Sequence, residues 1–148
     1  MIKINRFCLM SWLTGLGAVP FVILTLGLIP DFSMGFSQAQ LLRAQTSYGV
    51  VICSFMSGVC WGLQLNAIVR GKVFLVLLSN AIALAVWFSY LFLSATNFLI
   101  VLAVLFLILL VVDIFIYVLG GITKAYLQLR CAVTGLVVLS LISSWVIA

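Results

Sequence analysis

Two cysteines in one apolar stretch are the first residues whose chemistry needs an explanation. Cys53 and Cys60 lie in YGVVICSFMSGVCWGLQLN, residues 48–66, and such a pair could form a disulfide or bind a metal ion. On a helix, however, a spacing of seven residues separates the two Cα atoms by roughly 10 Å, whereas a disulfide requires about 4.4–6.8 Å. One zinc ion cannot take both thiolates either, because Zn–S distances are about 2.3 Å. Cys8 and Cys131 are expected near the reducing cytoplasmic surface, so all four cysteines are interpreted as packing residues.

A carboxylate within an apolar segment is the second candidate for chemistry. Asp113 is the only acidic residue inside a predicted span, and Lys124 and Arg130 follow it as the cationic candidates. Ionisable groups inside a membrane are rare and are usually paired or functional. We expect a structural ion pair between Asp113 and Arg130 at the cytoplasmic end of the last two spans. A proton or ion relay would need further ionisable groups across the membrane, and Asn66 and Asn80 are too few to extend one.

The composition assigns these residues to a membrane protein. Apolar residues make up 67% of the chain and charged residues 6%, against roughly 45–50% and about 25% in soluble domains. The chain has no histidine, which removes His-ligated metal or haem sites and a Ser/His/Asp triad. Its basic residues are scattered singly, so nucleic acid is not expected as a partner. We predict a non-enzymatic protein with no catalytic residues, no cofactor and no metal site.

Hydropathy predicts an all-α, polytopic membrane helical bundle that forms a single domain over residues 1–148. About 20 residues cross the hydrocarbon once, and five apolar segments are predicted as spans, at about 7–29, 48–69, 73–93, 97–119 and 130–148. One side of this map carries six basic residues, namely Lys3, Arg6, Arg70, Lys72, Lys124 and Arg130. The other side has only Arg43, nearly offset by Asp31. By the positive-inside rule, the N-terminus is predicted inside and the C-terminus outside.

The first segment must be distinguished from a signal peptide. Lys3 and Arg6 precede an apolar run of roughly 23 residues, which is longer than a usual signal-peptide core and has no small-x-small cleavage site. We therefore expect a retained helix. Pro20, close to Gly15 and Gly17, should kink it, because proline removes one backbone hydrogen bond and clashes with the preceding turn.

The sequence predicts where the second helix begins. Residues 37–40, Ser-Gln-Ala-Gln, match the S-x-x-Q capping box, and Phe36 and Leu41 occupy the positions of a hydrophobic staple. The helix is therefore predicted to begin near Gln38, outside the hydrocarbon. From there to Val69 it would measure roughly 48 Å at 1.5 Å per residue, beyond a hydrocarbon core of about 30 Å. It must either project from the membrane or bend.

One half of this helix carries small and polar side chains. At 100° per residue this small half contains Gly49, Cys53, Ser54, Ser57, Gly58, Cys60, Trp61 and Gln64. The bulky half contains Val51, Ile52, Phe55, Met56, Val59 and Leu63, with Gly62 and Asn66 as its exceptions. Small residues permit close approach of helices in a membrane, so we expect the small half to face the bundle. Ser54, Gly58 and Gly62 also form a small-x-x-x-small ladder, interpreted as a packing feature, with a ligand-lined groove as the alternative.

Two stretches of the chain, with an aspartate between them, resemble a known family. YGVVICSFMSGVCWG at 48–62, Asp113, and AYLQLRCAVT at 125–134 are similar to the DUF3429 family of small multi-spanning membrane proteins, the transmembrane protein 69-like proteins. The matching positions are Tyr48, Gly49, Ser54, Phe55, Gly58, Trp61, Gly62, Asp113, Tyr126, Leu129, Arg130 and Thr134. The chain departs from the pattern at Ser57 (usually glycine), Cys60 (a polar residue) and Ala125 (tryptophan). The resemblance implies a multi-pass protein of the bacterial inner membrane, or of the mitochondrial inner membrane if the chain is eukaryotic, in a family of unknown function.

Three functions remain open from the sequence. The favoured one is a structural, assembly or accessory protein of the lipid bilayer, which contacts a membrane-protein partner or a second copy through the second helix. The alternative is a small transporter or channel-like protein for a small solute or lipid, lined by Ser54, Ser57, Trp61, Gln64 and Asn80. A weaker third is a lipid- or quinone-handling enzyme that uses Asp113 and Arg130. The scarcity of ionisable groups and the lack of room for a soluble domain favour the first.

Overall fold

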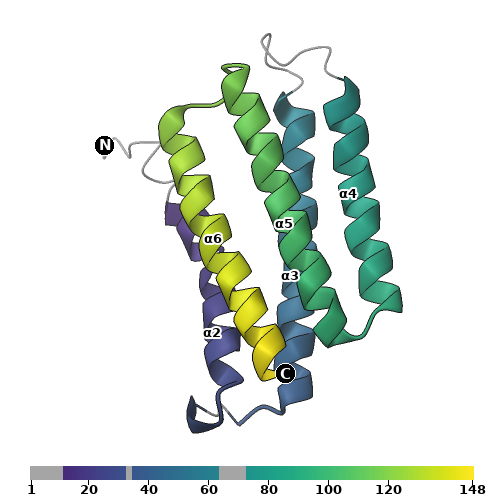
Figure 1. The fold of residues 1–148 in the computed structure, drawn as a ribbon, viewed down its shortest axis with the longest axis vertical. Helices are drawn as coiled ribbons and strands as arrows, with labels where there is room; N and C mark the ends of the chain where they lie inside the picture. Colours follow the sequence, from purple (N-terminus) through teal and green to yellow (C-terminus); the bar gives the residue numbers. More distant parts are fainter. Residues whose placement is uncertain (1–11, 33–34, 64–72) are drawn as a thin grey trace, which may run out of the picture.

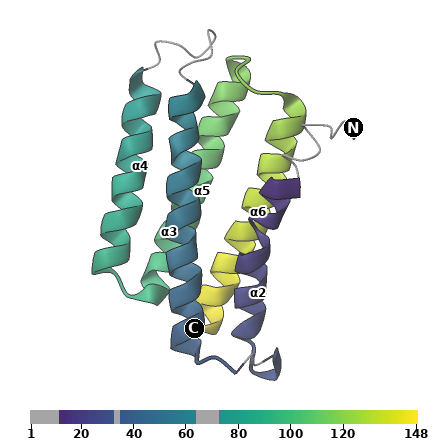
Figure 2. The same cartoon turned by 180° about the vertical axis from the view of Figure 1, so that it is seen from behind.

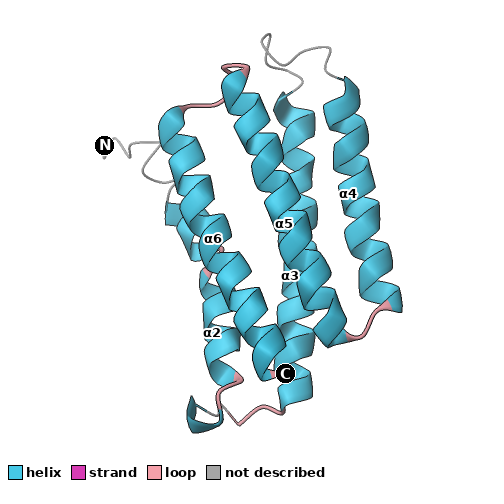
Figure 3. Cartoon of the chain, in the orientation of Figure 1, coloured by secondary structure: helices cyan, strands magenta, loops and turns pink. Residues whose placement is uncertain are grey.

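The computed structural model describes residues 12–32, 35–63 and 73–148 of the chain. Every secondary-structure element in these ranges is helical (Figure 3). In chain order the elements are α2 (Val19–Gly27), the 3-10 helix η1 (Pro30–Phe32), α3 (Gln38–Leu63), α4 (Val73–Phe92), α5 (Ala95–Val118) and α6 (Lys124–Ile147). The predicted all-α fold is confirmed.

The long helices form an up-and-down bundle (Figure 1). Helix α2 packs against α3 and α6, α6 packs against α5, and α5 packs against α3, so these four helices close into a ring. Helix α4 lies outside this ring and packs against α3 and α5, as the view from behind also shows (Figure 2). The ring encloses fully buried apolar side chains, among them Phe21, Phe98, Leu99, Leu102 and Leu141.

Four helices among the described residues are long and apolar enough to cross a membrane, namely α3, α4, α5 and α6. The apolar helical segment before them, Trp12–Gly27, is shorter. The predicted first span begins at residue 7, so part of it lies outside the described residues, as do residues 64–69 of the predicted second span. The count of five spans and the inside and outside positions of the termini stay predictions.

The predicted start of α3 is confirmed. The helix begins at Gln38, and the capping box is formed in both directions. The Ser37 backbone N–H donates to Oε1 of Gln40 over 2.8 Å, and the Gln40 backbone N–H donates to Oγ of Ser37 over 3.3 Å. Helix α3 contains 26 residues, which corresponds to roughly 39 Å at 1.5 Å per residue. It is therefore longer than a hydrocarbon core of about 30 Å.

The predicted start of the last helix was wrong. Hydropathy placed the span at 130–148 and treated 120–129 as a connection, but α6 begins at Lys124. Thr123 caps it, since its side-chain oxygen accepts a hydrogen bond from the Tyr126 backbone N–H over 3.3 Å. Hydropathy marks the residues that favour lipid, whereas the cap determines where the helix starts. The two boundaries differ here by almost two turns.

The predicted disruption near Pro20 is confirmed. The helical segment that includes Trp12 is interrupted by a turn at Gly17 and Ala18, and α2 begins at Val19 with Pro20 in its first turn. A proline fits this position because the first N–H groups of a helix have no intrahelical partner. The Tyr48 hydroxyl, from α3, donates a hydrogen bond to the carbonyl of Gly17 over 3.0 Å. A side chain of the next helix therefore supports the interruption.

The small half of α3 is only partly directed into the bundle. Gly49, Cys53, Ser57 and Cys60 are buried, as expected, and Tyr48 is half-buried. The small-x-x-x-small ladder is not in the interior: Ser54 is half-buried, whereas Gly58, Trp61 and Gly62 are exposed. Gln64 lies outside the described residues. The expectation that the small half faces the bundle therefore holds for Gly49, Cys53, Ser57 and Cys60 but is wrong for Gly58 and Trp61.

The buried face of α3 also includes part of the bulky half, which was not expected to face the bundle. Ile52, Met56 and Val59, assigned to the bulky half, are half-buried on the side of the ring. This burial follows from the neighbours, because α2, α4 and α5 all contact α3 and together cover an arc that overlaps both halves. The order of helices in the bundle, rather than side-chain size, determines this arc.

The closest glycine contact of α3 is with α5. A Cβ atom added at Gly49 would overlap the side chain of Leu102, which is fully buried. We expect Gly49→Leu to lower the free energy of unfolding by about 1–3 kcal/mol, the usual cost of an overpacked core. The control is Gly135→Leu on α6, where an added Cβ meets no atom within 4 Å. Unfolding in mild detergent by titration with a denaturing detergent measures both, and equal stability of the two variants would contradict the close contact.

Candidate functional site

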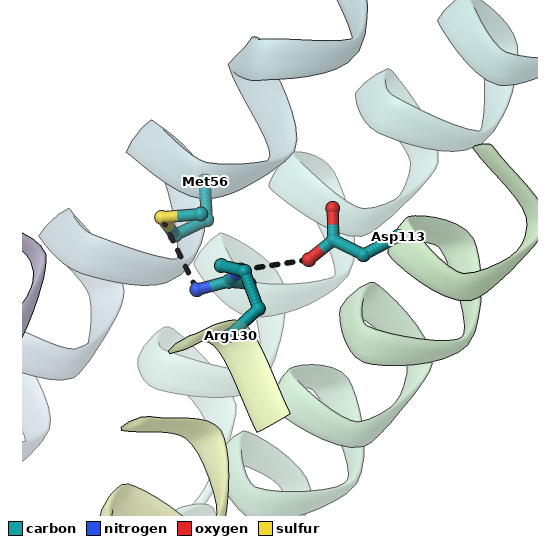
Figure 4. A network of polar contacts seen from close by, with 3 residues as sticks. All are labelled: Met56, Asp113 and Arg130. Atoms are coloured by element: carbon teal, nitrogen blue, oxygen red, sulfur yellow. Dashed lines mark hydrogen bonds and ion pairs between the residues drawn. The ribbon is translucent and has the colours of Figure 1, made fainter. Parts of the chain in front are cut away.

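The structure brings Asp113 and Arg130 together inside the bundle (Figure 4). Nε of Arg130 donates to Oδ2 of Asp113 over 2.7 Å, and their side chains are only 4% and 11% exposed, respectively. Lys124, the other cationic candidate, lies exposed at the start of α6. In an environment of low dielectric constant, a charge is tolerated when its partner is close and hydrogen-bonded. The two opposite charges of the pair therefore lie in the interior and neutralise each other.

A tight connection between α5 and α6 places the two residues opposite each other. Gly120 ends α5 with a φ of +78°, a conformation that glycine adopts readily. Its N–H donates to the carbonyl of Tyr117 over 2.8 Å, and the N–H of Gly121 donates to the carbonyl of Ile116 over 2.9 Å. These two bonds form a Schellman motif. The motif and the Thr123 cap reverse the chain, so that α6 runs back along α5.

Arg130 also reaches a third helix. Its Nη1 atom lies 3.7 Å from Sδ of Met56 on α3, and Figure 4 shows the guanidinium between Met56 and Asp113. A thioether sulfur is a weak acceptor, so this contact orients the group more than it stabilises it. Nη2 of Arg130 is buried and has no hydrogen-bond partner among the described residues. One edge of the guanidinium therefore keeps its donor capacity.

An apolar cavity of about 360 Å³ lies beside this guanidinium. Its walls come from the first helical segment, α3, α5 and α6. The lining residues are Leu13, Thr14, Gly17, Ile52, Phe55, Met56, Val59, Phe106, Tyr126, Arg130, Val133, Thr134 and Val137. Cavities that bind small molecules typically have about 300–1,000 Å³, mostly apolar walls and a few polar groups. This cavity has all three properties.

The polar residues of the cavity wall on α6 follow one helical face. Tyr126, Arg130 and Thr134 are spaced by four residues, so they lie above one another on α6. Thr134 is 1% exposed, and its hydroxyl has no partner within the described part of the chain. Sequence reasoning named all three but did not place them together. Their i, i+4, i+8 spacing was the available signal.

A second polar cluster joins α2, α3 and α6 and was missed by the sequence analysis. The Thr25 hydroxyl lies 2.8 Å from Oγ of Ser144, and Nε2 of Gln45 donates to Thr25 over 3.1 Å. Gln45 and Ser144 are fully buried. Polar side chains in apolar helices were the only hint to this cluster. It is a cross-link between helices, because its members mostly bond to one another.

The residues predicted to line a channel differ in their surroundings, as far as the structure describes them. Ser57 is buried and donates to the carbonyl of Ser54 over 2.8 Å, and its own carbonyl accepts from the hydroxyl of Ser79 over 2.6 Å. Trp61 and Asn80 are exposed on the outside of α3 and α4. These polar groups therefore serve helix packing or face outward.

The cysteines lie in different environments. Cys53 and Cys60 are buried free thiols, Cys131 is exposed, and Cys8 lies outside the described residues. Among the described residues, no three His, Cys, Asp or Glu side chains gather as a metal site. The groups with free hydrogen-bonding capacity beside a cavity are instead Arg130 and Thr134. This arrangement suits recognition of an oxygen acceptor by hydrogen bonds.

The burial of the ion pair makes a quantitative prediction. We expect Asp113→Asn and Arg130→Gln each to lower the free energy of unfolding by about 3–5 kcal/mol, because each leaves one buried charge without its counter-ion. The double variant should lose less than the sum of the two, since it leaves neither charge behind. Unfolding of all four proteins in mild detergent gives the coupling energy. Additive losses would contradict an energetic role for the pair.

One of three comparisons with known proteins gave a match. A family model described as "Protein of unknown function (DUF3429)" matches residues 8–146. Neither the search of curated proteins nor that of solved structures gave a match. The match covers nearly the whole chain, including α3, the ion pair and the α6 residues at the cavity. This helical chain therefore belongs to the DUF3429 family.

Proposed function

We propose that the protein is a non-enzymatic structural protein of the membrane that assembles with a second copy of itself through the outer face of α3. The outer face of α3 comprises Val51, Ser54, Phe55, Gly58, Trp61 and Gly62. At 100° per residue, these residues fall on one side of the helix.

One observation carries the proposal: the two glycines of the small-x-x-x-small ladder have open space around them within the described chain. A Cβ added at Gly58 or Gly62 would meet no atom within 4 Å. Glycine inside a helix costs about 0.5–1 kcal/mol relative to alanine, and among the described residues no close approach offsets that cost at these two positions. In membranes, such ladders let two helix backbones approach closely and associate.

A second copy is the simplest occupant of this face. A ladder of small residues is self-complementary, because the same face on two copies can form a symmetric contact with a single helix from each. Phe55 and Trp61, 71% and 55% exposed, flank the ladder and offer apolar area on either side. Both sides of the contact are then supplied by residues of this chain.

The membrane location is part of the same proposal. Four apolar helices are compatible with a membrane-embedded protein. The family resemblance supports the inner membrane of a bacterium, or of a mitochondrion if the chain is eukaryotic. The distribution of Lys and Arg in the sequence supports an orientation with the connection between α5 and α6 on the inside. The alternative of a channel has less support, since Ser57 is used in packing and Trp61 and Asn80 face outward.

Self-association in lipid vesicles tests the proposal. Copies labelled with a donor or an acceptor fluorophore should show energy transfer that depends on the protein-to-lipid ratio. We expect Gly58→Leu to weaken association at least about tenfold, equivalent to about 1.4 kcal/mol, because a bulky side chain separates the two backbones. Gly135→Leu, also at a glycine with open space around it, should leave association unchanged.

Two results would overturn self-assembly through α3. The first is a wild-type protein that stays monomeric at every protein-to-lipid ratio. The second is a dimer that Gly58→Leu and Gly135→Leu affect equally, which would place the contact on another surface or make the loss unspecific. Unfolding measurements on each variant separate a lost contact from lost folding.

A further inference from the structure

The cavity beside Arg130 has buried hydrogen-bond donors in its wall. Two buried donors, Nη2 of Arg130 and the hydroxyl of Thr134, have no partner within the described residues. Arg130 is 3% exposed and Thr134 1%, so water in the surroundings does not reach them freely. A buried donor without an acceptor costs about 1–3 kcal/mol. Both residues belong to the wall of the same cavity, which makes the cavity the candidate place for an acceptor.

The wall of the cavity includes apolar side chains on the outside of the bundle. Leu13 and Phe55 belong to its wall and are 60% and 71% exposed, respectively. Both lie on apolar segments of the bundle, where the surroundings are hydrocarbon if the chain spans a membrane. A molecule dissolved in the bilayer could therefore enter between the first helical segment and α3.

The charges at the cavity determine which polar group of a ligand can bind there. Asp113 lies 2.7 Å from Arg130 and already neutralises it, so the polar end of the cavity has donors but no net positive charge. An anionic head group would place a second negative charge near Asp113 in a medium of low dielectric constant, which is costly. A neutral carbonyl oxygen accepts two hydrogen bonds without this cost.

We propose that this cavity binds an uncharged membrane-dissolved molecule whose carbonyl oxygen accepts hydrogen bonds from Arg130 and Thr134. The apolar body of the ligand lies against Leu13, Ile52, Phe55, Val59, Val133 and Val137. Lipid quinones and neutral glycerides share this chemistry, a carbonyl oxygen on an apolar body. The site mainly uses the ring side of α3, and Phe55 is the one residue that it shares with the outer face of α3. Gly58→Leu, which is outside the cavity wall, therefore tests self-assembly separately from ligand binding.

Native mass spectrometry of the full chain in mild detergent tests the proposal. Four probes are added one at a time: a decyl-substituted benzoquinone, mono-oleoylglycerol, decylbenzene and oleate. We expect one-to-one binding of the benzoquinone, the glyceride or both, which distinguishes the two sources of the carbonyl. Decylbenzene, which has no acceptor, and oleate, which is anionic, should bind at least about tenfold more weakly.

Matched variants test whether the probes bind in this cavity. Thr134→Val keeps the side-chain shape and removes one donor, so we expect it to weaken binding of the carbonyl probe about two- to tenfold, and Thr134→Ser to retain it. Thr46→Val is the control: Thr46 is also buried but donates to the carbonyl of Leu42 and does not line this cavity. Val133→Phe should block binding by filling the cavity, whereas Val111→Phe, at an exposed position of α5, should not.

Several outcomes would overturn the inference. If neither carbonyl probe binds, the cavity does not take a ligand of the proposed class. If oleate binds as tightly as the carbonyl probes, the cavity does not select against a negative charge. Equal affinity of wild type and Thr134→Val, with the folded fraction checked by detergent titration, removes Thr134 from the site. If Val133→Phe fails to fold, the near-isosteric Thr134→Val still decides the question.

Discussion

A polar group inside a bilayer must find its partner within the protein, because the hydrocarbon offers none. The pair of Asp113 and Arg130 is the clearest consequence of this constraint. It brings two charges into the interior, joins α5 to α6 over 2.7 Å and orients Arg130 against α3. Three of the four helices of the ring are thereby held in register by a single cationic side chain. The connection at Gly120 and the cap at Thr123 are arranged so that the two charges meet.

The same constraint explains the other cross-links of the bundle. Apolar contact with lipid is nearly as favourable as apolar contact with protein, so polar bonds and close packing have a larger part in fixing helix positions. Thr25, Gln45 and Ser144 connect α2, α3 and α6, and Ser79 connects α4 to α3. Gly49 adds close packing, since α3 and α5 approach each other at the side chain of Leu102. Each of these contacts defines which helix lies beside which.

Helix α3 presents two surfaces with different chemistry. Its outer face has the ladder of Ser54, Gly58 and Gly62 and lacks contacts with the described chain at both glycines. Its ring side contributes Ile52, Met56 and Val59 to the cavity beside Arg130. The first suits association with another helix and the second suits an apolar ligand with a carbonyl oxygen. Structural assembly and ligand binding are thus compatible on one helix.

The sequence by itself determined the features that depend on local interactions. Composition identified a helical membrane protein, the capping box located the start of α3, and Pro20 predicted the interruption before α2. Asp113 stood out because it is an ionisable residue among apolar ones. Only the tertiary structure decided which arc of α3 is buried, and that Tyr126, Arg130 and Thr134 line one cavity. The physical reason is that caps and hydropathy act within one helix, whereas the buried face depends on its neighbours. In a bilayer, both lipid and protein accept apolar side chains, so side-chain polarity along one helix leaves its orientation open.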